Sequence, residues 1–276
     1  MKCFHLVTFV VVKCSNLYFC INSQRIKMNL QSEKEWFKCW FNSEYYHVLY
    51  KDRDAADARI LIDNIVSLLK PDHDSKILDI GCGKGRHSLY FSKKNYFVTG
   101  IDISEKNIEY ARKSENDRLS FFVHDMRNLF RINFFDIALN LFTSFGYFEK
   151  ERENRNAIAS VVKSLKPGGI FVIDFMNSKK VIRELVAEEL KAVDGIDFTI
   201  KRYIENDFII KEIDFFDKGI NHSFTERVRT FTKDDFDAYL GLYGFKTIHL
   251  FGDYYFNEFD EQKSDRLIII AQKGKK

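Results

Sequence analysis

The stretch Ile77-Leu78-Asp79-Ile80-Gly81-Cys82-Gly83-Lys84-Gly85 joins a short apolar segment to three alternating glycines. The residues that follow, 86–94, have the pattern of a helix. Strand, glycine loop and helix in this order let the backbone approach a ligand closely, because glycine has no side chain and tolerates positive φ. The helix directs free amides and the positive end of its dipole into the loop, which favours a carboxylate or phosphate. By itself the stretch leaves a second interpretation open, a tight turn without a ligand.

The glycines follow the spacing G-x-G-x-G, whereas a dinucleotide-binding fingerprint has G-x-G-x-x-G. Asp102 ends the next predicted strand, 96–101, and can accept hydrogen bonds from both ribose hydroxyls of an adenosine. A single acidic residue at a strand end can also be a helix cap. The combination of glycine loop and Asp102 favours the ligand over the cap.

A third strand end carries His124-Asp125-Met126-Arg127, directly after the predicted strand 119–123. Asp125 lies where it could accept a hydrogen bond from an adenine amino group. Glycines, Asp102 and Asp125 would then occupy three consecutive strand ends on one edge of the sheet. That edge is where open α/β sheets bind ligands.

The rest of the chain alternates helical and strand patterns. Such alternation predicts a parallel sheet covered by helices on both faces. The predicted helices are 52–70, 86–94, 104–113, 149–165, 181–190 and 233–243, and the predicted strands are 76–80, 96–101, 119–123, 134–139 and 170–175.

Three further strands are predicted at 198–204, 208–216 and 222–231, with turn residues between them, and they form an antiparallel meander. The last two strands, 245–251 and 267–271, have no crossover helix between them and should pair antiparallel. The predicted fold class is therefore α/β. We expect a Rossmann-like, doubly wound, seven-stranded and mostly parallel sheet with an antiparallel last strand, and a small β meander inserted at about 195–231.

Over roughly residues 44–273 the chain resembles the class I S-adenosylmethionine-dependent methyltransferases. The matching segments are ILDIGCGKG (77–85), VTGIDIS (98–104), VHDMRNL (123–129), FFDIALNLFTSFGYF (134–148) and LKPGGIFVIDFMN (165–177). The ordered set is far more specific than any one segment. Within the superfamily the chain is most similar to small-molecule methyltransferases such as amino-sugar N-methyltransferases.

The resemblance implies that S-adenosyl-L-methionine is the cosubstrate. It places the glycine loop against the methionine part, Asp102 on the ribose, and Asp125 at the adenine edge. Arg53 could pair with the cofactor carboxylate, or be a solvated residue at a helix start. The positions to which the resemblance gives cofactor-binding roles are Asp79, Gly81, Cys82, Gly83, Asp102, Ile103, Asp125, Met126, Asn140, Leu141 and Arg53.

The acceptor side carries weaker signals. The loop 140–143 reads Asn-Leu-Phe-Thr, so the superfamily's N-P-P-Y type motif is absent. Tyr147 and His124 are the candidate catalytic residues, although a strand-end histidine can equally be satisfied by backbone. A neutral amine needs only a route for its proton, whereas a hydroxyl needs a positioned base, so N-methylation is favoured over O-methylation. Candidates for the acceptor pocket are Tyr45, Tyr46, His47, Tyr147, Arg229 and Tyr254.

Composition narrows the class of protein. The 276 residues carry a formal net charge of +3, which argues against a dedicated nucleic-acid binder. The five cysteines include no C-x-x-C pair, which argues against a metal site and indicates a reducing, cytoplasmic compartment. The apolar run 4–12 is too short to span a bilayer.

Residues 1–27 are expected to be an extension outside the fold, with the methyltransferase domain over 28–276. An accessory strand or helix and a signal or anchor are the other interpretations of this extension. We expect a monomer or homodimer that methylates a small molecule, without nucleic-acid or membrane partners. A nicotinamide oxidoreductase, a non-catalytic cofactor-binding protein, and a methyltransferase of RNA or protein are the rival functions.

Overall fold

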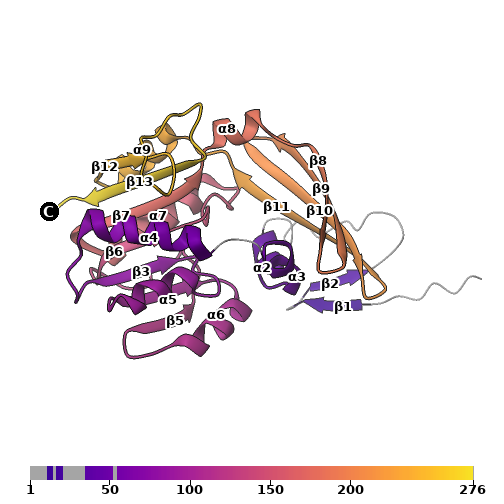
Figure 1. Cartoon of the computed structure of the whole chain (residues 1–276), viewed down its shortest axis with the longest axis horizontal. Helices are drawn as coiled ribbons and strands as arrows, with labels where there is room; N and C mark the ends of the chain where they lie inside the picture. The colour runs from indigo at the N-terminus through magenta and orange to yellow at the C-terminus, as the bar shows by residue number, and fades with distance from the viewer. Residues whose placement is uncertain (1–10, 15–16, 21–34, 52–54, 276) are drawn as a thin grey trace, which may run out of the picture.

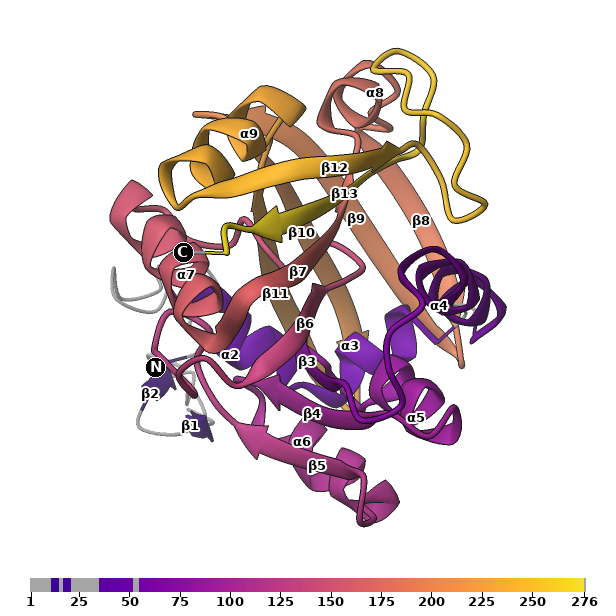
Figure 2. The same ribbon diagram turned by 90° about the vertical axis from the view of Figure 1, so that its left-hand side faces the viewer.

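The structure is a computed structural model that describes residues 11–14, 17–20, 35–51 and 55–275. Its larger sheet has seven strands in the order β12-β13-β7-β6-β3-β4-β5, which Figure 2 shows in sequence. Only β13 runs antiparallel to its neighbours, which confirms the predicted fold class. The strands are β3 (Lys76–Ile80), β4 (Phe97–Asp102), β5 (Leu119–Val123), β6 (Phe135–Asn140), β7 (Leu165–Met176), β12 (Phe245–Phe251) and β13 (Arg266–Lys273).

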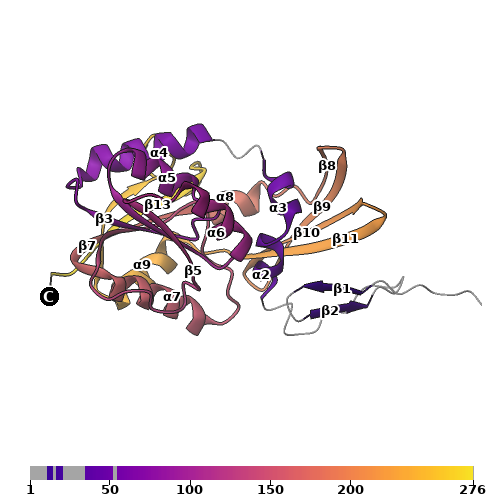
Figure 3. The same ribbon diagram turned by 90° about the horizontal axis from the view of Figure 1, so that it is seen from below.

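Helices cover both faces of this sheet, α4 and α5 on one side and α7 and α9 on the other (Figure 3). Successive residues of a strand point to opposite faces of the sheet. Ile77 packs in the hydrophobic cluster that includes α4 and α5, and Leu78 packs in the hydrophobic cluster that includes α7 and α9. The helices are α4 (Ala55–Leu69), α5 (Arg86–Lys93), α6 (Glu105–Ala111), η1 (Arg112–Ser114), α7 (Glu151–Ser164), α8 (Ser178–Arg183) and α9 (Lys233–Leu242).

A second, antiparallel sheet has four strands in the order β11-β10-β9-β8. The helix predicted over 181–190 is wrong beyond Arg183, because α8 ends there and the strand β8 begins at Glu188. Apolar residues at Val181, Val186 and Leu190 suited a helical period, but 188–193 alternates in exposure as a half-buried strand does. The strands are β8 (Glu188–Val193), β9 (Ile196–Glu205), β10 (Phe208–Asp217) and β11 (Ile220–Arg229).

Two short helices, α2 (Trp36–Phe41) and α3 (Glu44–Leu49), lie between the two sheets (Figure 1). Trp36, Phe37 and Trp40 are buried, and the Ser43 hydroxyl caps α3 by accepting a hydrogen bond from the amide of Tyr45. Within the expected extension 1–27, the structure describes one antiparallel strand pair, β1 (Val11–Cys14) with β2 (Leu17–Cys20).

Candidate functional site

A cavity of about 360 Å³ lies at the carboxyl ends of the central strands. It is bounded by the glycine loop, the ends of β4 and β5, the loop after β6, and the aromatic side chains of α2 and α3. Most of the site residues predicted from sequence line it together: Gly81, Cys82, Gly83, Asp102, Ile103, His124, Asp125, Met126, Leu141 and Tyr147. Asp79 and Asn140 are not among the lining residues, and Arg53 falls outside the described residues.

The glycine loop has a bare backbone toward the cavity. Gly81 has φ +72°, and a Cβ there would lie 2.8 Å from the Cβ of Ser144, so this turn has no room for a side chain. Gly83 has φ +56°, and a Cβ built on it would meet no atom within 4 Å. The space beside Gly83 is therefore open for a ligand to contact the backbone.

Asp102 is bonded to this loop. Its Oδ2 accepts from the Gly83 amide at 2.9 Å and its Oδ1 accepts from the Ser104 amide at 2.8 Å. Burial raises the pKa of Asp102, and hydrogen bonds from the Ser104 amide, the Gly83 amide and the Asn107 side chain partly oppose that rise. A carboxylate has about four acceptor positions, so these three donors leave roughly one for a hydroxyl of a ligand.

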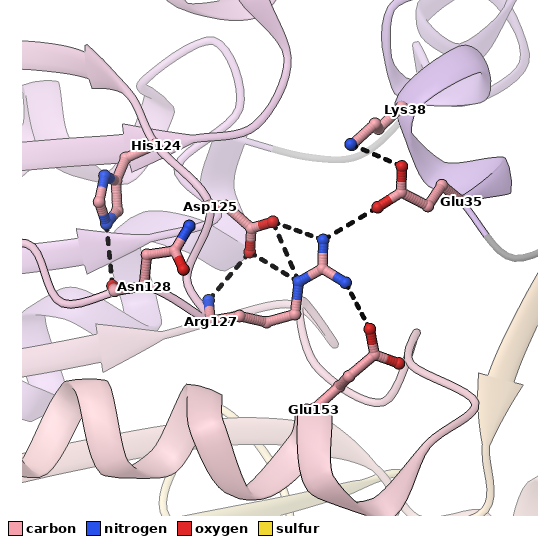
Figure 4. Close-up of polar contacts among 7 residues, drawn as sticks. All are labelled: Glu35, Lys38, His124, Asp125, Arg127, Asn128 and Glu153. Carbon is pink, nitrogen blue, oxygen red and sulfur yellow. Dashed lines mark hydrogen bonds and ion pairs between the residues drawn. The ribbon is translucent and has the colours of Figure 1, made fainter.

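Asp125 is held by Arg127, whose Nε lies 3.0 Å from each carboxylate oxygen (Figure 4). Burial alone would raise the pKa of Asp125, but the hydrogen bonds and charge of Arg127 outweigh it, and the pKa is lowered. Asp125 therefore faces the cavity as an ionised group that only accepts hydrogen bonds.

Asp79 and Asn140 support the site from beneath. Asp79 Oδ2 accepts from the Ser88 hydroxyl at 2.5 Å, and burial raises the pKa of Asp79 to about 6. Asn140 Nδ2 donates to the carbonyls of Ile80 and Ser144, both at 3.2 Å. These contacts connect β3, α5 and the loop after β6. Asp79 and Asn140 thus support the cavity without lining it.

The loop after β6 has an unusual backbone. Phe142 and Thr143 have φ of +57° and +58°, a left-handed conformation that side chains with a Cβ seldom adopt. Buried Asp174 fixes it: its Oδ2 accepts from the Phe142 amide at 2.8 Å, and its carbonyl accepts from the Thr143 amide at 2.9 Å. Tyr147 completes the loop by donating its hydroxyl proton to the Thr143 carbonyl at 2.5 Å.

Three histidines line the cavity. His124 Nε2 lies 2.9 Å from the Asn128 carbonyl, so this nitrogen carries the proton, as expected of a strand-end histidine satisfied by backbone. His47 Nε2 lies 2.7 Å from Asn107 Oδ1. His87 was not singled out from sequence; burial and the charge of Arg86 lower its pKa to about 3, so it is neutral.

We call α2 and α3 the roof of the cavity, because their side chains cover it opposite the strand ends. Of the six acceptor-pocket candidates, Tyr46, His47 and Tyr147 line the cavity, whereas Tyr45, Arg229 and Tyr254 do not. Tyr45 and Arg229 have other partners: the Tyr45 hydroxyl donates to Asp217, and Arg229 Nη2 donates to the Glu149 carbonyl. The lining also includes Phe37, Phe41, Tyr50 and Lys51, which no motif marked, and Phe148, the last residue of the matching segment 134–148.

The small sheet supports the roof from behind and contributes no residue to the lining of this cavity among the described residues. Glu226 on β11 accepts from Trp40 Nε1 at 2.6 Å and from the Tyr50 hydroxyl at 2.7 Å. Lys211 on β10 lies 3.8 Å from the same carboxylate. Side chains of β10 and β11, far from the roof in sequence, thus hold α2 and α3 in place.

Among residues 35–51 and 55–275, no group of three or more metal-ligating side chains lies close enough together to hold an ion. No helix in the described part of the chain has the length and apolarity required to cross a bilayer.

Comparisons with known proteins agree with this geometry. The profile of a family described as "Methyltransferase domain" matches residues 77–169. The Bacillus subtilis (strain 168) protein named "Putative methyltransferase YqeM" is 29% identical over 214 residues, which cover 72% of this chain and 85% of that protein.

Two further proteins extend the comparison. A dTDP-3-amino-3,4,6-trideoxy-alpha-D-glucopyranose N,N-dimethyltransferase of Streptomyces venezuelae is 30% identical over 136 residues, covering 48% of this chain and 56% of that enzyme. The crystal structure of an S-adenosylmethionine-dependent methyltransferase from Clostridium acetobutylicum superimposes with a TM-score of 0.71 at 19% identity, covering 83% of this chain and 96% of that one. The chain therefore carries a methyltransferase domain over residues 77–169, and its fold is that of S-adenosylmethionine-dependent methyltransferases.

Proposed function

We propose that this enzyme transfers a methyl group to a nitrogen, or alternatively an oxygen, of a small molecule. The observation that carries the proposal is the cavity itself, in which the cofactor-type strand ends and the aromatic side chains of the roof line one space. Concave pockets of this size that are lined by aromatic side chains and a few polar groups suit small molecules.

Residue roles follow from positions around the cavity. Gly81, Cys82 and Gly83 would contact the methionine part of S-adenosyl-L-methionine through their backbone. Asp102 would accept a hydrogen bond from the ribose hydroxyls, and Ile103 would pack on the adenine. Asp125 and Met126 would read the adenine edge, and Leu141 would lie near the sulfonium.

The bound cofactor supplies a methyl group that is already activated by a positively charged sulfur. The chain must then align a nucleophile, exclude water and accept or release one proton. The rings of Phe37, Phe41 and Tyr147 line the cavity and would favour a cationic centre by cation–π attraction. An amine acceptor fits these features, because it needs no strong base once it is neutral.

The Streptomyces relative is named as an enzyme that methylates an amino sugar nucleotide on nitrogen. We therefore propose amine-bearing small molecules, amino sugars among them, as the first acceptors to test. A protein that only binds the cofactor would share the same strand ends, and it would differ in lacking turnover.

The test is a screen with S-adenosyl-L-methionine labelled in its methyl group, against amino sugars, amino acids and their hydroxyl analogues. Label in an amine-bearing small molecule is the expected result. Label in RNA or protein, with none in the metabolites, would reject the proposed acceptor class. Binding of S-adenosylhomocysteine without transfer to any acceptor would favour the non-catalytic alternative.

A further inference from the structure

Arg127 joins three carboxylates that belong to three separate elements (Figure 4). Its Nη2 lies 2.5 Å from Asp125 Oδ2 and 3.1 Å from Glu35 Oε1, and its Nη1 lies 2.7 Å from Glu153 Oε1. Asp125 follows β5, Glu35 is the N-cap residue of α2, and Glu153 lies in the first turn of α7. With 16% of its side chain exposed, the guanidinium is largely enclosed by these partners.

The contacts at Asp125 fix the orientation of its carboxylate. Arg127 offers its backbone amide to Oδ1 at 2.9 Å, its Nε to both oxygens, and its Nη2 to Oδ2. Each carboxylate oxygen therefore accepts two contacts from Arg127 alone, and the ionised carboxylate is held rigidly at the edge of the cavity.

The contacts at Glu35 fix the beginning of the roof. Phe37, in the first turn of α2, packs against Phe148 with ring centroids 5.7 Å apart, and both rings line the cavity. The Arg127 guanidinium lies 4.9 Å from the Phe148 ring centroid and 5.8 Å from that of Phe37. Arg127 therefore touches the roof through both a carboxylate and an aromatic ring.

We propose that Arg127 is a positioning residue that couples recognition of the adenine edge by Asp125 to closure of α2 over the cavity. The proposal rests on the proposed role of Asp125 in the cofactor site. Arg127 acts through Asp125 and Glu35. Without it, Asp125 would lose its orientation, and Glu35 would keep its ion pair with Lys38 inside α2 but lose the one that connects α2 to the residues after β5.

The experiment combines calorimetry with hydrogen exchange on the full chain, using S-adenosylhomocysteine as the probe. In the wild type, saturating ligand should slow amide exchange both at 124–128 and in α2. Arg127→Gln should bind at least tenfold more weakly, and its α2 amides should gain no protection when the ligand is saturating. Arg127→Lys should not restore coupling, because a point charge cannot bridge three carboxylates.

Glu35→Gln and Glu153→Gln form a matched pair, since each removes one carboxylate from the same guanidinium. Glu35→Gln should reduce ligand-dependent protection of α2 and weaken binding a few-fold. Glu153→Gln should keep protection and hold affinity within twofold, because Glu153 is not on the roof.

Equal protection of α2 in the two variants would overturn the coupling, even if Arg127→Gln fails to fold. Failure of the wild type to bind the ligand would instead overturn the proposed cofactor site, and with it this proposal.

Discussion

The amide of Gly83 donates a hydrogen bond of 2.9 Å to Oδ2 of Asp102, so the glycine loop and the acidic strand end are one connected unit. The two residues belong to separate sequence motifs 19 positions apart. Because each residue orients the other, the bare backbone and the remaining acceptor position of the carboxylate face the same part of the cavity. Changes at either residue should therefore affect the same ligand.

Asp102→Ala should weaken S-adenosylhomocysteine binding by roughly 1.5–3 kcal/mol, as expected when hydrogen bonds to a charged group are lost. Isothermal titration calorimetry measures this loss directly. Asp117→Ala, an exposed loop residue, is the control and should bind as the wild type does. Unchanged affinity in Asp102→Ala, or binding of NADH in place of S-adenosylhomocysteine by the wild type, would contradict the assignment of the site.

Tyr147 allows its ring and its hydroxyl to be tested separately. The ring contacts Trp36 and Phe41 with centroids 5.4 Å away, whereas the hydroxyl donates to the Thr143 carbonyl. Tyr147→Ala should lower turnover at least tenfold and cofactor affinity less, because the roof loses a packed ring. Tyr147→Phe should keep turnover within about threefold. If Tyr147→Phe abolished turnover with normal binding, the hydroxyl itself would be the catalytic group.

Glu226→Gln tests the attachment of the roof to the small sheet. The change removes the negative charge beside Lys211 and weakens the acceptor for Trp40, so the free energy of unfolding should fall by about 1–3 kcal/mol. Glu212→Gln is the matched control, since Glu212 neighbours Lys211 on β10 and faces the opposite side of the sheet. Urea unfolding of both variants measures the difference. Equal midpoints for the two would show that Glu226 does not anchor the roof.

The pH dependence of stability should reveal Asp79. Its folded-state pKa of about 6 exceeds the usual aspartate pKa of about 3.9, so the folded state binds the proton more tightly. The carboxyl's contribution to stability is thus complete below pH 4 and is lost as the pH rises through 6. Asp79→Asn mimics the protonated form and keeps an acceptor for Ser88.

The stability of Asp79→Asn relative to the wild type should therefore increase between pH 4 and 7, by up to roughly 3 kcal/mol, and then level off. Urea unfolding at pH 4.5, 6.0 and 7.5 provides the measurement. A difference that does not vary with pH would mean that Asp79 titrates normally.

A chain that begins at Met28 should fold with an unchanged melting temperature and an unchanged affinity for S-adenosylhomocysteine. The reason is that the matching motifs and the cavity lie entirely beyond that residue. Thermal unfolding and calorimetry on the shortened chain are the measurements. A large loss of stability would show that residues 1–27 belong to the fold.

Local patterns sufficed for the main sheet. Apolar runs bounded by glycine or acidic residues predicted β3 to β7 to within a few residues, although β7 begins at Leu165 and the predicted strand began at residue 170. The helix predicted from residue 104 begins there, because the Ser104 hydroxyl accepts a hydrogen bond from the Asn107 amide at 3.2 Å. Such features depend on contacts within a few residues of one another.

Contacts between distant residues could not be predicted in the same way. Trp40 and Glu226 are 186 positions apart, and neither lies in a motif. Arg127 lies in the matching segment 123–129, but its partners Glu35 and Glu153 lie outside every matching segment. Only the folded structure brings these two carboxylates to Arg127. The position of the roof and its contacts with the small sheet could therefore not be predicted from the sequence.

The attachment of the roof has a consequence for the order in which the protein is made. The ribosome synthesises α2 and α3 before any strand of the two large sheets. Asp217, the partner of Tyr45, follows it by 172 residues, and Glu226, the partner of Trp40, follows it by 186 residues. At about 5–20 residues per second, this interval is on the order of ten to forty seconds. During it, the aromatic residues of the roof have no sheet to pack on, and β13, which pairs with β7, has not been made. The enclosed cavity is thus a property of the finished chain, and a nascent chain that has completed only the first strands can present the glycine loop but cannot cover a ligand bound there.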